Sequence, residues 1–80
     1  MSERTENIGQ RETLRHIAKR LDAEASSHRD SIRAALPLAG EVAAIDEDYV
    51  MSLVVALSEK VRELRGMNKK IEILNRELDG

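Results

Sequence analysis

Apolar residues recur with helical spacing in two long stretches of the chain, on either side of a segment with the single proline. In the first stretch, residues 10–36, the seam positions alternate in steps of four and three, with one histidine among them: Leu14, Ala18, Leu21, Ala25, His28, Ile32 and Ala35. Such heptad spacing lines residues along one side of an α-helix. We therefore predict a helix over 10–36. Residues 1–9 lack this pattern and are expected to be flexible.

The second stretch, residues 46–78, repeats the same heptad spacing. Its seam consists of Val50, Val54, Leu57, Val61, Leu64, Asn68, Ile71, Asn75 and Leu78. Asp46 is a favourable N-cap for a helix that starts there. Gly66 lies inside and costs about 1 kcal/mol relative to alanine. The heptad phase is unchanged across Gly66, so we predict one continuous helix, with a break at Gly66 as the alternative.

The segment between the two helices, residues 37–45, has the composition of a turn. Pro37 disfavours helical geometry in the residue before it and has no N–H, so it ends the first helix. Gly40 can adopt positive φ, and residues 41–45 fit a short helical turn. Because a short connection makes consecutive helices antiparallel neighbours, the predicted fold is an all-α antiparallel hairpin, forming a single domain over residues 10–80.

The beginning of the second helix is apolar around most of its circumference. Residues 49–57 read YVMSLVVAL, and one neighbouring helix cannot cover such a segment on every side. The chain has 80 residues and no cysteine, so its stability depends on regular packing or oligomerisation rather than disulfides. We predict a homodimeric four-helix bundle with coiled-coil-like packing, leaving open parallel or antiparallel pairing and higher oligomers. The expected self-association residues are Val50, Leu53, Val54, Leu57, Val61 and Leu64.

Asn68 and Asn75 stand where the heptad pattern would place core residues. Asparagine among seam valines and leucines is typical of a two-stranded zipper, in which it selects register. The residues before the stripe are acidic and then apolar, which argues against a basic DNA-binding zipper. We favour a second interpretation, in which the second helix outruns the first, so that its end protrudes or frays in water and polar residues there cost little. That arrangement would expose an apolar strip to an unidentified protein partner: Met67, Ile71, Leu74 and Leu78.

Basic residues follow one flank of the first helix: Arg11, Arg15, Lys19, Arg29 and Arg33. Like charges four residues apart on a helix repel one another and lower its stability. Binding of phosphate is one function that would explain such a basic stripe. Acidic neighbours interrupt the flank, the formal net charge is −2, and Tyr49 is the single aromatic residue. The chain therefore has little means of stacking on bases. We favour a solvated helix face and keep a nucleic-acid-binding regulator as the alternative.

Residues that carry catalysis or bind metals are sparse. There is no cysteine nucleophile, no glycine-rich phosphate loop and no zinc motif. Each of the two histidines has a glutamate four residues before it, whereas di-metal helical bundles use a spacing of three. We therefore predict no catalytic residues, no metal site, no cofactor and no enzymatic activity.

No apolar run approaches the roughly 20 residues that span a membrane, and the polar N-terminus lacks a signal-peptide pattern. We therefore expect a cytoplasmic protein without membrane contact. The predicted function is a small non-enzymatic adaptor, regulator or assembly factor, which acts through self-association and helical surfaces.

Overall fold

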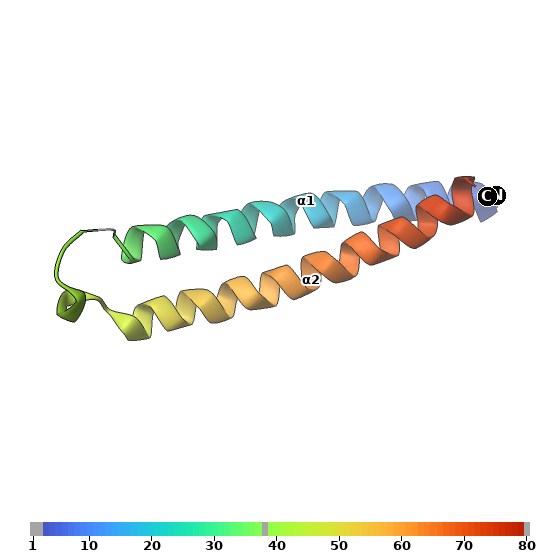
Figure 1. Cartoon of the computed structure of the whole chain (residues 1–80). Helices are drawn as coiled ribbons and strands as arrows, with labels where there is room; N and C mark the ends of the chain where they lie inside the picture. The colour runs from blue at the N-terminus through green and yellow to red at the C-terminus, as the bar shows by residue number, and fades with distance from the viewer. Residues whose placement is uncertain (1–2, 38, 80) are drawn as a thin grey trace.

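The chain forms a long antiparallel pair of α-helices. In the computed structural model, which describes residues 3–37 and 39–79, helix α1 spans Glu3–Ala35, a 3₁₀ turn η1 spans Val42–Ala44, and helix α2 spans Glu47–Asp79. The hairpin measures 61 × 17 × 14 Å. Both chain ends lie at one end and the connection lies at the other (Figure 1). The predicted all-α helical hairpin is confirmed.

Helix α1 begins seven residues before the predicted start. Residues 3–9, which were expected to lie outside the helix, are part of it, while residues 1 and 2 lie outside the described part of the chain. Glu3 and Glu6 place negative charge in the first turn, where the helix dipole favours it. The Arg4 guanidinium also donates a hydrogen bond of 2.9 Å to the Leu78 carbonyl of α2. Charge and a tertiary contact, rather than an apolar pattern, accompany helix formation here.

The start and the continuity of α2 agree with the sequence prediction. Asp46 Oδ1 accepts a hydrogen bond of 3.1 Å from the Tyr49 backbone N–H, as an N-cap does. The helix then continues through Gly66 to Asp79 without interruption. In the connection, Gly40 has φ 113°, and η1 is the short helical turn expected there. Leu38, within the predicted turn, is outside the described residues.

The two helices have equal lengths of 33 residues, so α2 does not outrun α1. The predicted protruding or frayed end of α2 is therefore wrong. Leu78 retains 7% exposure, and Asn7 Nδ2 donates to Glu77 Oε2 at 3.4 Å. The additional turns at the start of α1 cover this end of α2.

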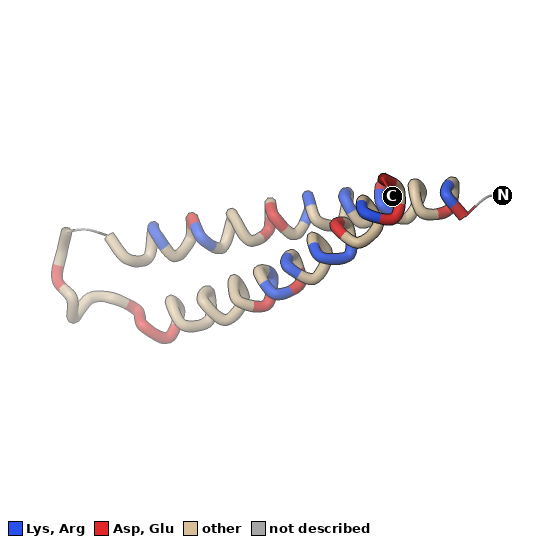
Figure 2. The backbone as a smooth tube through the Cα atoms, turned by 45° about the vertical axis from the view of Figure 1, so that its right-hand side comes forward, with Lys and Arg blue, Asp and Glu red and all other residues tan. Residues whose placement is uncertain are grey.

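The tightest packing lies away from the connection. The buried apolar residues of the described chain are Ala18, Leu21, Ala25 and Leu78. Small alanines on α1 allow close approach of the α2 backbone, and Leu21 fills the interface with 3% exposure. Between residues 26 and 77, no described residue is buried, and the helices separate toward the connection (Figures 1 and 2). The hairpin is thus well closed in one half and loosely closed in the other.

Candidate self-association surface

The N-terminal half of α2 presents apolar side chains on two sides. The first side contacts α1 and contains five of the six predicted self-association residues, all half-buried: Val50, Leu53, Leu57, Val61 and Leu64. The sixth, Val54, is 47% exposed. Five of these residues are therefore partly covered within the hairpin, whereas Val54 is exposed.

The second side lies at roughly a right angle to the first, and its apolar side chains are exposed. Met51 is 64% exposed, Val54 47% and Val55 56%. Ser58 is half-buried and lies on the same side, since residues 51, 54, 55 and 58 fall within about 100° of one another on a helix. We call these four residues the outer stripe.

Charge is absent from this part of α2. No charged residue occurs between Asp48 and Glu59, and Figure 2 shows the corresponding turns without acidic or basic colouring. The rest of α2 carries charges along its whole length (Figure 2). The exposed apolar segment is therefore confined to the three turns after the helix start.

One charged residue of each sign flanks the outer stripe. Glu47 lies four residues before Met51, and Arg62 lies four residues after Ser58, so both continue the same side of α2. Both side chains are exposed, and neither forms an ion pair among the described residues. The stripe thus has a free carboxylate at one end and a free guanidinium at the other.

The seam between the helices has one strong polar contact. Lys60 Nζ and Glu24 Oε2 are 2.7 Å apart. The hydrogen bond from Lys60 lowers the pKa of Glu24, and the bond to Glu24 raises the pKa of Lys60. Lys60 is therefore already paired within its own hairpin.

A groove next to this contact is lined by Ala25, Leu57, Val61 and Leu64, among others. The seam between the helices is therefore open to solvent there.

The residues predicted for a protein partner at the end of α2 lie against α1. Met67, Ile71 and Leu74 are half-buried, and Leu78 is buried. The apolar strip expected there depended on an uncovered tail, and that premise is wrong. We therefore place no partner surface at this end.

The two seam asparagines have different environments. Asn75 Oδ1 accepts a hydrogen bond of 3.2 Å from Arg11 Nη1, while Asn68 is exposed. Arg11 from α1 thus satisfies one asparagine within the hairpin. Neither an asparagine pair across a zipper nor a protruding wet end is needed to explain Asn75.

The basic flank of α1 is partly neutralised by its own neighbours. Glu12 lies 3.1 Å from Arg15 and 3.7 Å from Arg11, and Arg29 lies 3.6 Å from Asp30. Lys19 and Arg33 are exposed and form no ion pair within the described chain. The five residues do not present five free cations, and the nucleic-acid alternative gains no support from their arrangement.

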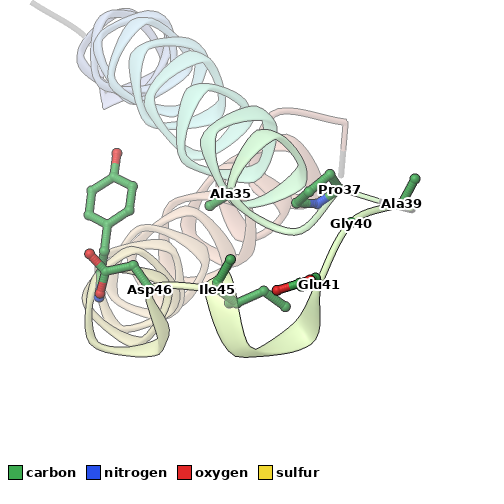
Figure 3. A pocket seen from close by; sticks show the side chains of 9 residues that line it. Ala35, Pro37, Ala39, Gly40, Glu41, Ile45 and Asp46 are labelled. Atoms are coloured by element: carbon green, nitrogen blue, oxygen red, sulfur yellow. The ribbon is translucent and has the colours of Figure 1, made fainter.

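A hollow beneath the connection is lined mainly by small and apolar side chains. Figure 3 shows Ala35, Pro37 and Ile45 around it, together with the carboxylates of Glu41 and Asp46. Asp46 already caps α2. Across residues 3–37 and 39–79, no group of three or more histidine, aspartate or glutamate side chains is placed to hold a metal ion, and no helix is long and apolar enough to cross a membrane.

The sequence analysis did not single out Met51, Val55 or Arg62. The sequence nevertheless contains a second helical pattern, offset from the main seam by roughly 100° around the helix. It consists of Glu47, Met51, Val54, Ser58 and Arg62. The heptad seam is the stronger pattern, because it extends over the whole helix.

Comparison of the chain with protein-family models, curated proteins and solved structures finds no match in any of the three.

Proposed function

We propose that this chain is a self-associating helical interaction module, a non-enzymatic adaptor, regulator or assembly factor whose hairpins pair through α2 into a four-helix arrangement. The observation that carries the proposal is the outer stripe. Apolar side chains at Met51, Val54 and Val55 are about half exposed or more, in the part of the hairpin where no described residue is buried.

The total exposed area supports the same conclusion. The chain exposes 6255 Å², whereas a compact monomer of 9.0 kDa exposes roughly 4,900 Å². A standard protein–protein interface buries about 800 Å² on each partner. The surplus is therefore large enough for a specific interface, and pairing would reduce it by covering apolar surface that one hairpin leaves in water.

Packing within a bundle also accounts for the two apolar sides of α2. A helix in a four-helix bundle contacts two neighbours and needs apolar residues toward both. The first side of α2 faces α1, and the outer stripe lies at roughly a right angle to it. A second hairpin that packs on the outer stripe would give α2 its second neighbour.

Molar mass in solution tests this proposal. By light scattering we expect wild type at twice the chain mass of 9.0 kDa. Val54→Asp places two carboxylates in the paired interface, which costs at least about 3 kcal/mol and weakens dimerisation roughly 100-fold or more.

Ser52→Asp is the matched control, because Ser52 is exposed and lies about 200° around α2 from Val54. It introduces the same charge within the same turn and should leave the dimer intact. A wild type that is folded by circular dichroism and monomeric at high concentration would overturn the proposal. Equal weakening by both aspartates would show that the outer stripe is not the interface.

A further inference from the structure

We propose that the occupant of the outer stripe is a second copy of this chain in antiparallel orientation, with the two-fold axis passing between Val54 and Val55 of each α2. The inference rests on the proposed self-association and specifies its geometry. Sequence reasoning leaves parallel and antiparallel pairing open. The position of the charges around the stripe distinguishes them.

An antiparallel pair of identical helices is centred on a two-fold axis, so residues equally distant from the centre face one another. With the centre between Val54 and Val55, Val54 of one copy lies opposite Val55 of the other. Met51 lies opposite Ser58, which places a long side chain against a small one. Glu47 lies opposite Arg62.

The six residues 47, 51, 54, 55, 58 and 62 also share one side of the helix circumference. At 100° per residue, Met51 and Ser58 lie within about 20° of one another, close to the middle of the stripe. Glu47 and Arg62 lie at similar angles on opposite flanks of that middle, as do Val54 and Val55. All six residues therefore lie within about 50° of the middle of the stripe, so a partner helix centred on the stripe is within reach of each of them.

Charge complementarity favours this orientation over the parallel one. In the antiparallel pair, each free Glu47 carboxylate faces a free Arg62 guanidinium, which gives two ion pairs for each dimer. In a parallel pair, Glu47 would face Glu47 and Arg62 would face Arg62, so that both contacts repel. Neither side chain has an ion-pair partner among the described residues of its own hairpin that would compensate.

The extent of the apolar segment also places the centre near the connection rather than at the middle of the hairpin. Beyond Ser58 the same side of α2 carries Arg62, Arg65 and Lys69. A full-length overlap of two hairpins would set these cations into the interface. Overlap of the two α2 helices limited to residues 47–62 pairs Arg62 with Glu47 and leaves Arg65 and Lys69 outside that overlap. The well-closed end of each hairpin then projects as an arm.

This geometry fixes the length of the dimer. The distance along α2 from the two-fold axis to Asp79 is about 37 Å at 1.5 Å per residue, so the antiparallel dimer extends roughly 75 Å. A parallel or fully overlapped dimer would have about the 61 Å length of one hairpin. Small-angle X-ray scattering of the wild type separates the two without any substitution.

Disulfide mapping tests the contacts themselves, since the chain has no native cysteine. Glu47→Cys and Arg62→Cys chains are prepared separately, shown by light scattering to dimerise when reduced, and oxidised singly or as an equal mixture. We expect covalent dimers that join residue 47 to residue 62 in the mixture alone, identified by mass spectrometry. Each variant alone should remain largely uncrosslinked, because its two cysteines would lie about 22 Å apart along the helix.

The outcomes separate the two proposals. Cross-linking of each single variant with itself, or a wild-type dimer of about 61 Å, overturns the antiparallel geometry and leaves self-association standing. A wild-type monomer overturns both. If loss of the ion pairs makes the cysteine variants monomeric, the scattering length of the wild type decides the orientation by itself.

Discussion

Individual residues in this hairpin derive their roles from neighbours that are distant in sequence. Glu24 lies four residues before His28 on α1, but its shortest ion pair is with Lys60 of α2, at 2.7 Å. Asn75 occupies a seam position where a zipper would place an asparagine mate, yet its partner is Arg11. In both cases the residue type indicated a polar contact, and the pairing depended on how the two helices are set against each other.

The Glu24–Lys60 contact makes stability depend on pH in a defined direction. The folded-state pKa of Glu24 lies below its ordinary value of 4.5, so its contribution is complete above pH 4.5 and is lost as pH falls through the lowered pKa. The pKa of Lys60 lies above its ordinary value of 10.5, so its contribution is complete below pH 10.5 and is lost as pH rises through the raised pKa.

We expect Lys60→Met to lower the thermal midpoint at pH 7 slightly and to reduce the loss of stability below pH 4.5, because it removes the hydrogen bond that is the largest cause of the lowered pKa of Glu24. Circular dichroism melts between pH 2 and 7 measure both effects. Arg76→Met is the control, since Arg76 pairs with Glu72 within one exposed helix face. An acid profile unchanged by Lys60→Met would show that the contact is not maintained in solution.

The helices follow the local rules of the sequence closely, with one informative difference. Asp46 caps α2, Pro37 follows the end of α1, and the heptad phase continues across Gly66. The start of α1 is the exception. Residues 3–9 have no apolar seam, and a contact with the far end of α2 accompanies their helical structure, which local pattern could not reveal.

Replacing Gly66 tests the continuity of α2. A Cβ built at Gly66 meets nothing within 4 Å, and the residue has ordinary helical geometry. Gly66→Ala should therefore stabilise the protein by about 1 kcal/mol, because alanine loses less conformational entropy in a helix. Urea or thermal unfolding measures the change.

Gly9→Ala is the matched comparison in α1, since a Cβ there also meets nothing within 4 Å. A similar gain is expected if the first turns of α1 are helical in solution. Destabilisation by Gly66→Ala would indicate a break in α2 at this point and contradict the continuous helix.

The hairpin as a unit is long, thin and unevenly closed. Its buried residues lie on α1 from Ala18 to Ala25 and at the end of α2, while the most apolar part of the chain surrounds the loosely closed half. Burial of apolar area is the main source of stability in a small domain. A chain that leaves its most apolar turns half exposed is therefore expected to gain stability from association.

Coupling of folding to association predicts a concentration-dependent melting temperature. For a dimer, a hundredfold increase in concentration favours the folded dimer by about 2.7 kcal/mol, which for a chain of this size raises the midpoint by several degrees. Calorimetric scans over a hundredfold range of protein concentration measure this shift of the melting temperature. Val54→Asp should melt at a lower temperature that does not vary with concentration, and a wild type that behaves in the same way would contradict coupled folding.

The amino-acid pattern by itself determined the all-α hairpin, the N-cap at Asp46, the turn at Gly40 and the apolar character of the first half of α2. These features follow from periodicity, propensity and turn chemistry, which act over a few residues. The tertiary structure decided the equal helix lengths, the covered tail, the Arg11–Asn75 and Glu24–Lys60 pairs, and the side of α2 that stays exposed. Those depend on the register and separation of two helices, set by summed packing along their full length, which no short segment encodes.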